Sequence, residues 1–242
     1  MDIRAVEQQA LGCVKCRLSE TRTQVVWADG NFDSKFLLIG EAPGRNEDLQ
    51  GRPFVGAAGQ LLDRLLAEVG LDRGRVAIAN VIKCRPPGNR DPLPDEIETC
   101  SPWLQAQLAY MQPDVIVTLG NFATKFVLQS PVGITRARGQ VYQRNGSAIV
   151  PTFHPAAALR GGRFGGMDPT DAIRADLKVA AAELAAAAAR ATVPPEPEPG
   201  LEVVPRETAS AGSQDQRETA SAESQDHRET ASAGSQDQMG LF

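Results

Sequence analysis

The chain has 242 residues, a formal net charge of −5 at pH 7 and 42% hydrophobic residues, which is sufficient for one ordinary globular domain with an appendage. Its apolar runs fall short of the roughly 18–20 residues that a membrane-spanning helix requires, and the first residues lack the apolar stretch of a signal peptide. We therefore expect a cytoplasmic protein that does not bind membranes. Structural disulfides are rare in that compartment, so the four cysteines need another explanation.

The charge is distributed unevenly along the chain. Residues 1–190 carry 22 Lys and Arg against 20 Asp and Glu, whereas residues 191–242 carry 3 Arg against 10 acidic residues. A weakly basic body permits binding to nucleic acid but does not require it. Composition alone therefore leaves the function open.

The first 190 residues alternate between short aliphatic runs and helical patterns. The aliphatic runs end in Gly, Asn or Pro and suit parallel strands covered on both faces; they span residues 35–40, 75–80, 114–120 and 147–151. The helical patterns span residues 58–69, 94–110, 121–129 and 171–190. This alternation predicts an α/β domain over residues 1–190, a three-layer α/β/α sandwich around a central, mainly parallel four-stranded sheet.

The rest of the chain has a different composition. Residues 193–200 read VPPEPEPG, which is typical of an extended spacer, and three 11-residue repeats beginning RETASA follow from Arg206, Arg217 and Arg228. The repeats contain only alanine and polar residues, so they have no apolar stripe to bury. We expect residues 191–237 to be a disordered linker.

Three polar side chains follow predicted strands. Glu41 follows the first strand, Asn80 ends the second and His154 follows the fourth. The carboxyl ends of parallel strands meet at one edge of a sheet, so a carboxylate, an amide and an imidazole would converge there. A single histidine is more often a packed or surface residue, and that alternative stands until other residues support the site.

The cysteines suggest a metal centre. Cys13 and Cys16 form a CxxC pair, and Cys84 and Cys100 are available as two further ligands. The spacing does not separate zinc from an iron–sulfur cluster. A redox-active CxxC pair is a rival, but such a pair normally follows a strand, whereas this one precedes the first. Buried free thiols are the remaining alternative.

Five ordered motifs give the chain a family resemblance: CVKCRLSETRTQVV, GEAPGRNED, GRPFVGAAGQLLD, NVIKCRPPGNRDP and HPAAAL. Together they resemble the family 4 uracil-DNA glycosylases, the iron–sulfur branch of the uracil-DNA glycosylase superfamily, over roughly residues 5–185. The resemblance implies a [4Fe–4S] cluster on Cys13, Cys16, Cys84 and Cys100. It also implies a monofunctional base-excision enzyme that flips uracil out of DNA and hydrolyses its N-glycosidic bond.

The resemblance also assigns roles to individual residues. His154 would donate a hydrogen bond to uracil O2, and Glu41 would orient the attacking water. Ala42 stands where family 1 enzymes carry an aspartate, so the water-activating role passes to Glu41 by inference. The remaining residues of the uracil-binding set would shape the pocket: Gly40 and Ala42 as backbone, Glu47 as a wall against a 5-methyl group, Phe54 as the stacking ring and Asn80 as the pairing amide.

A second set of residues would bind the DNA. Leu159, in the HPAAAL box, would be the apolar wedge that fills the vacated stack. The arginines expected to contact phosphates are Arg85, Arg90 and Arg160, with Arg136, Arg138 and Arg163 as further candidates.

Residues 238–242 read QMGLF and end a polar segment with three apolar side chains. They resemble the short peptide by which bacterial repair proteins bind the β sliding clamp, with Gln238, Leu241 and Phe242 making the contacts. The expected partners are therefore uracil-containing DNA and the clamp, and we expect the enzyme itself to be a monomer. The alternative function is a non-catalytic or broader-specificity iron–sulfur protein that binds DNA lesions.

Overall fold

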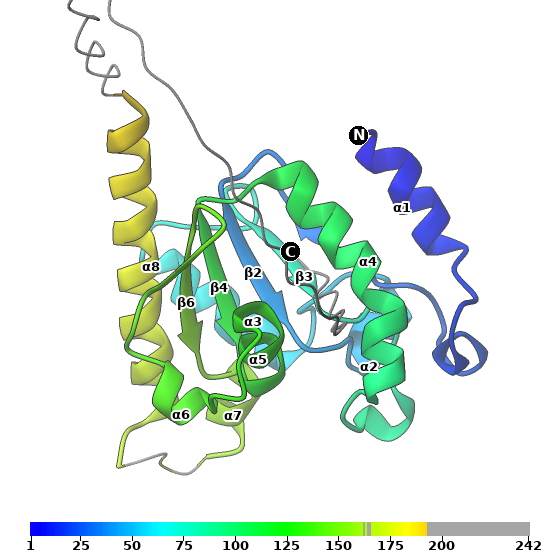
Figure 1. Ribbon diagram of the computed structural model, residues 1–242. Coiled ribbons are helices and arrows are strands. Elements are labelled where there is room, and N and C mark those ends of the chain that lie inside the picture. The colour runs from blue at the N-terminus through cyan, green and yellow to red at the C-terminus, as the bar shows by residue number, and fades with distance from the viewer. Residues whose placement is uncertain (162, 164–165, 193–242) are drawn as a thin grey trace, which may run out of the picture. The chain divides into compact units, whose positions relative to one another are not determined.

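A computed structural model describes residues 1–161, 163 and 166–192. The expected linker and the clamp-binding peptide lie outside the described residues. Within them, six strands form one sheet in the order β1-β3-β2-β4-β6-β5 (Figure 1). The strands are β1 (Asp29–Gly30), β2 (Phe36–Gly40), β3 (Ala77–Asn80), β4 (Val115–Leu119), β5 (Tyr142–Arg144) and β6 (Ser147–Thr152).

The four central strands are the predicted ones, and they pair in parallel. The prediction of four strands was wrong in number, because β1 and β5 extend the sheet at its two edges in antiparallel pairing. β1 has only two residues, and β5 has the polar, partly exposed sequence YQR, so neither shows the hydrophobic pattern of a buried strand. The turn between β5 and β6 contains Asn145 and Gly146, both at positive φ, which is a hairpin signal in the sequence.

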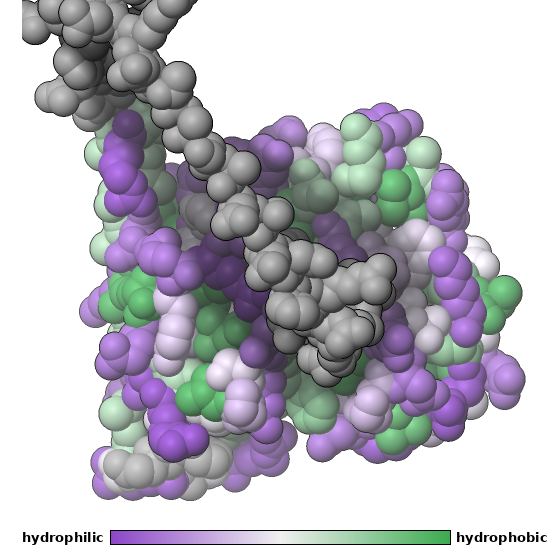
Figure 2. Space-filling model, viewed as in Figure 1, coloured by the Kyte–Doolittle hydropathy of each residue, from purple (hydrophilic) through white to green (hydrophobic). Residues whose placement is uncertain are grey.

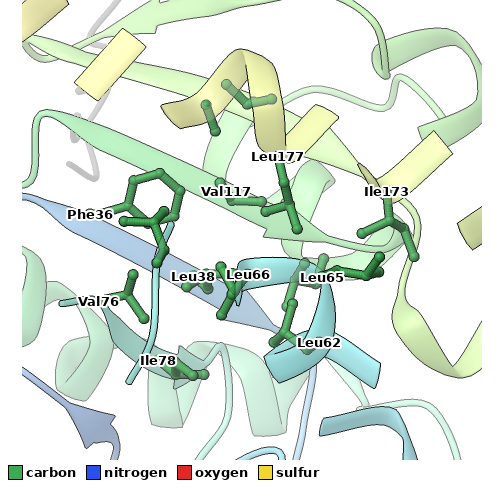
Figure 3. Packing of buried hydrophobic residues seen from close by; sticks show 14 of the residues in the cluster. Phe36, Leu38, Leu62, Leu65, Leu66, Val76, Ile78, Val117, Ile173 and Leu177 are labelled. Atoms are coloured by element: carbon green, nitrogen blue, oxygen red, sulfur yellow. The ribbon is translucent and has the colours of Figure 1, made fainter. Parts of the chain in front are cut away.

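Helices cover both faces of the sheet, so the three-layer arrangement is present (Figure 1). Alternate residues of β2 face opposite ways: Phe36 and Leu38 belong to one hydrophobic core, and Leu37 and Ile39 to the other. In the first core, leucines of α3 and α8 pack against the strands, as Figure 3 shows. The second core lies beneath α1, α4 and α5. The sheet is thus buried on both faces, as its aliphatic strands predicted.

The helix bounds differ from the predicted ranges by two residues or fewer at each end. The helices are α1 (Ile3–Leu11), α2 (Arg45–Gln50), α3 (Ala57–Ala67), α4 (Pro94–Met111), α5 (Asn121–Leu128), α6 (Ile134–Ala137), α7 (Pro155–Leu159) and α8 (Pro169–Thr192). Two short 3-10 turns lie at Arg17–Glu20 and Pro87–Asn89. The sequence patterns missed α1 and also the three shortest helices, α2, α6 and α7, which have few residues to show a period.

The surface of the described part mixes hydrophilic residues with small hydrophobic patches on the face seen in Figure 2. Among the described residues, no helix is both long and apolar enough to cross a membrane.

Arg138 is a structural residue, which corrects its assignment to DNA phosphates. Its guanidinium pairs with Asp176 at 3.1 Å, and the two side chains are 12% and 5% exposed. The same group lies 5.1 Å from the ring centre of Phe153. Because α6 precedes Arg138 and α8 carries Asp176, the ion pair holds these two segments together.

Candidate active site

A cavity of about 380 Å³ opens beside the carboxyl ends of the parallel strands. It brings together most of the residues that the sequence analysis singled out. Those lining it are Glu41, Ala42, Glu47, Phe54, Asn80, Arg90, His154 and Arg160. The expected convergence of the carboxylate, the amide and the imidazole is therefore present, with the register that pairs Gly40 with Asn80 setting two of the positions.

Gly40, the last residue of β2, makes room for two neighbouring side chains. A Cβ atom at this position would lie 2.4 Å from Asn80 Oδ1 and 2.6 Å from Phe54 Cζ. A Cβ atom does not approach other heavy atoms that closely, so the strand end needs glycine. The amide and the aromatic ring can then both lie against the floor of the cavity.

Asn80 presents an unsatisfied acceptor. Its side chain is 2% exposed, and Oδ1 has no hydrogen-bond partner among the described residues. Its backbone carbonyl is occupied, since it accepts from Lys83 Nζ at 2.8 Å. A buried acceptor without a partner typically costs about 1–3 kcal/mol, and a ligand that donates to it removes that cost.

His154 is held as a neutral imidazole in one tautomer. Nδ1 accepts a hydrogen bond from the backbone N–H of Ala156 at 3.1 Å, so the proton of the neutral ring lies on Nε2. Burial, reinforced by the nearby Arg160 cation, lowers the pKa of His154 to about 4. The ring lies 5.5 Å from that of Phe54 with an interplanar angle of 27°. Near neutral pH the side chain therefore offers a single N–H donor.

Glu41 is the carboxyl of the cavity whose pKa is raised. Burial, together with the negative charge of Asp91, raises its pKa to about 7. Asp91 also lines the cavity, although no sequence pattern indicated it as a site residue. It stands next to Arg90 in the RPPGNRDP motif, and an acid in an otherwise basic segment is the one signal that could have identified it. Other lining residues that were missed are Pro43, Gly44, Pro86, Asn89 and Ala156.

Glu47 supports the loop that carries Phe54. Its Oε1 accepts hydrogen bonds from the backbone N–H groups of Val55 and Gly56, both at 2.9 Å. The other carboxylate oxygen lies beside Gly44, where a Cβ atom would come within 2.7 Å of it. One oxygen is thus committed to the backbone, and exclusion of a 5-methyl group by Glu47 stays a prediction.

The expected DNA-binding residues differ in their availability. Leu159, at the end of α7, is 50% exposed. Arg85 donates to Asn89 Oδ1 at 2.6 Å, and Arg90 pairs with the fully buried Glu96 at 2.6 Å. Arg90 and Arg160 line the cavity, whereas the exposed Arg136 and Arg163 are not among its lining residues. Contact of Leu159 and these arginines with DNA stays a prediction.

The four cysteines line a second, smaller cavity between the N-terminal segment and α4. All four are free thiols, and burial raises the pKa of Cys84 and raises that of Cys100 to about 11. Arg22 donates to Cys84 Sγ at 3.3 Å, and the backbone N–H of Lys83 donates to Cys100 Sγ at 3.2 Å. Donors aimed at buried sulfurs suit thiolates, which need a bound cation in such surroundings.

The thiols surround this cavity rather than meeting at one point. Within the part of the chain that the structure describes, no three His, Cys, Asp or Glu side chains are close enough to hold a single metal ion. The four thiols that line one cavity are the residues available to hold a metal centre there.

The cavity thus places a carboxylate, an amide and an imidazole at the carboxyl edge of a parallel sheet that is covered on both faces. The family model of the uracil DNA glycosylase superfamily matches residues 27–178. The chain belongs to the uracil-DNA glycosylase superfamily.

Within the superfamily, the chain belongs to the type-4 family. A type-4 uracil-DNA glycosylase from Sulfurisphaera tokodaii is 45% identical over 167 residues, which cover 65% of this chain and 76% of the relative. Type-4 enzymes from Archaeoglobus fulgidus and Thermotoga maritima are each 46% identical over 64% of this chain, covering 81% and 82% of those proteins.

The raised pKa of Glu41 predicts a pH-dependent effect of Glu41→Gln on stability. The native state holds the Glu41 proton more tightly than the unfolded chain does, so wild-type stability falls as pH rises from 4.5 to about 7. The glutamine side chain of the variant does not ionise, so its free energy of unfolding has no such loss. Above pH 7 we expect the free energy of unfolding of the variant to exceed that of the wild type by about 1 kcal/mol. This difference is smaller than the full pKa shift of Glu41 implies, because water screens a half-buried group.

Thermal melting at several pH values checks this expectation. The two proteins should melt alike near pH 4.5, where native Glu41 is protonated. An equal difference in melting temperature across the whole range would show that the carboxyl does not titrate as described. Excision by the variant should fall, since the site loses its anion.

Proposed function

We propose that the cavity binds an extrahelical uracil base and that this chain, as a uracil-DNA glycosylase of base-excision repair, hydrolyses the bond between uracil N1 and C1′ of the deoxyribose. The unsatisfied Oδ1 of Asn80 is the observation that carries this proposal. Uracil presents a donor at N3 and an acceptor at O4, which match the oxygen and the NH₂ group of one amide. Cytosine presents the reverse pattern.

Cleavage moves an electron pair from the glycosidic bond onto the base. The leaving uracil then carries negative charge on O2, and the sugar becomes a cation of oxocarbenium type. We assign His154 Nε2–H as the donor to O2, because the Ala156 N–H fixes that tautomer. A preorganised donor of this kind contributes about 3 kcal/mol to transition-state stabilisation.

The sugar cation requires an anion and a water molecule on its other side. Glu41 is our candidate for both tasks, as its ionised carboxylate can stabilise the cation and accept a proton from the water that adds to C1′. Ala42 supplies only backbone, so no second carboxylate comes from that position. With a pKa of about 7, Glu41 is ionised over the alkaline half of the physiological range.

The remaining contacts shape the pocket and hold the DNA. Phe54 would stack on the base, and Glu47 would face its C5 edge, where thymine carries a methyl group. Leu159 would enter the duplex where the base has left, and Arg160, with Arg85 and Arg90, would contact phosphates.

A [4Fe–4S] cluster is the group that we propose for the cysteine-lined cavity, held by Cys13, Cys16, Cys84 and Cys100. When bound, it would crosslink the N-terminal segment to the two segments that carry Cys84 and Cys100. Its contribution would be structural, since a ligand shared among distant segments adds its binding free energy to folding. The support is the arrangement of the thiols and their hydrogen-bond donors.

Asn80→Asp tests whether the Asn80 amide recognises the uracil base. The change removes the amide donor and leaves two acceptors, so uracil loses its partner at O4. We expect the single-turnover rate of uracil excision to fall by about 10- to 100-fold, which is the equivalent of one lost buried hydrogen bond. The ratio of the uracil excision rate to the cytosine excision rate should also decrease. Full uracil activity with unchanged discrimination would contradict the assignment.

Asn121→Asp is the matched control. Asn121 follows β4, and its Oδ1 accepts from the N–H of Ile134 at an exposed position away from the cavity. The same chemical change there should leave excision and discrimination unaltered.

Iron analysis and absorption spectroscopy test the cluster. Protein isolated without oxygen should contain about four irons and absorb broadly near ~400 nm, as cysteine-ligated iron–sulfur clusters do. Cys84→Ala should lose both signals and part of its folded yield. Thr99→Ala, at a residue of the same cavity without a thiol, should keep them. Stoichiometric zinc in place of iron would contradict the proposal.

The terminal peptide is proposed as a docking element for the β sliding clamp, through Gln238, Leu241 and Phe242. Five residues bury little area, so binding should be weak by itself, while a flexible linker of about 45 residues would reach roughly 35–40 Å and keep the domain near the clamp.

A titration with the clamp should show binding by the full chain and none after removal of residues 238–242. Excision on short oligonucleotides should be equal for both, and equal clamp binding would refute the proposal.

A further inference from the structure

Phe54 has a strained backbone. Its φ is 54°, in the left-handed region that non-glycine residues seldom occupy, and its side chain is only 6% exposed. A conformation of this kind costs of order 1–3 kcal/mol and persists only where surrounding contacts hold it. The contacts that hold Phe54 therefore determine where its ring lies in the cavity.

Arg73 makes the contacts on one side of this residue. Its Nη2 donates to the carbonyl oxygen of Phe54 at 2.5 Å, and its Nη1 donates to that of Pro53 at 3.1 Å. The guanidinium is fixed in turn by two carboxylates, Asp29 at 2.5 Å and Asp63 at 2.9 Å. The side chain is 22% exposed, so these bonds are partly shielded from water.

The other contacts leave Phe54 little freedom. Glu47 binds the N–H groups of Val55 and Gly56, immediately after Phe54. At Gly59, a Cβ atom would lie 1.7 Å from the Phe54 carbonyl oxygen, so the loop lies directly against α3. The Glu47 carboxylate thus binds the two backbone N–H groups after Phe54, and the Arg73 guanidinium binds the carbonyl oxygens of Phe54 and the residue before it.

Arg73 does not line the cavity, and it cannot touch a base bound there. Through Asp29 it connects the loop to β1, the two-residue edge strand. We propose that Arg73 is a positioning residue for uracil excision, which acts by fixing Phe54 in the orientation that stacks on the base. This inference rests on the proposed stacking role of Phe54.

A double-mutant cycle on the full-length protein tests the inference. Single-turnover excision of uracil from an oligonucleotide is measured for wild type, Arg73→Met, Phe54→Ala and the double variant, each below its melting temperature. Arg73→Met should slow excision by about 10- to 100-fold, the scale for a misplaced substrate-positioning group. In the Phe54→Ala background, the same change should slow it by no more than about twofold, because the ring on which Arg73 acts is already gone.

Arg52→Met is the matched control. Arg52 binds the same Asp29, at 3.0 Å, and makes no hydrogen bond to the carbonyls of Pro53 or Phe54. Its loss should leave excision within about twofold of wild type. Arg73→Lys serves as a second variant that keeps the charge; a single ammonium cannot reproduce the forked guanidinium contacts, so an intermediate loss is expected.

The possible outcomes distinguish failure of the positioning role of Arg73 from failure of the stacking role of Phe54. If Phe54→Ala slows excision and the effects of Arg73→Met and Phe54→Ala multiply, Arg73 acts on the fold in general and the inference is overturned. If Arg73→Met leaves excision unchanged, it is overturned as well. If Phe54→Ala itself leaves excision unchanged, the proposed stacking role fails, and the inference that depends on it fails too.

Discussion

The parallel pairing of β2, β3, β4 and β6 is the constraint on which the site depends. Parallel strands point the same way, so their carboxyl ends lie at one edge, and every segment that leaves the sheet there starts from a fixed position. Glu41, Asn80 and His154 lie far apart in the sequence but follow or end three of these strands. The two hydrophobic cores that clamp the sheet therefore also fix the relative positions of the carboxylate, the amide and the imidazole.

The site contains several features that lower the stability of the domain, and packing elsewhere in the domain offsets their cost. Asn80 has an acceptor without a partner, Phe54 has a strained backbone, and Glu41 has a carboxyl whose burial opposes ionisation. Each would be avoided in a domain selected for stability alone. Asn80 and Glu41 also each present a group that a ligand can satisfy, since a donor can bind Asn80 Oδ1 and a cation can stabilise the Glu41 carboxylate.

The sequence predicted the parts of the structure that depend on local pattern. The four central strands and the longer helices follow from hydrophobic periodicity, and the positions of Glu41, Asn80 and His154 follow from the ends of those strands. It could not predict β1, because a two-residue edge strand has no period. It also missed the partnership of Arg138 with Asp176 and the presence of Asp91, since these depend on which distant segments the fold brings together.

The N-cap of α7 joins two parts of the enzyme in a single helical turn. The imidazole of His154 accepts the N–H of Ala156, and Leu159, the exposed apolar residue, ends the same five-residue helix. The backbone of this short helix therefore connects the group proposed to stabilise the departing base with the residue proposed to enter the DNA. The five residues after His154 set the separation between these two side chains, so a residue inserted into or deleted from α7 would change that separation.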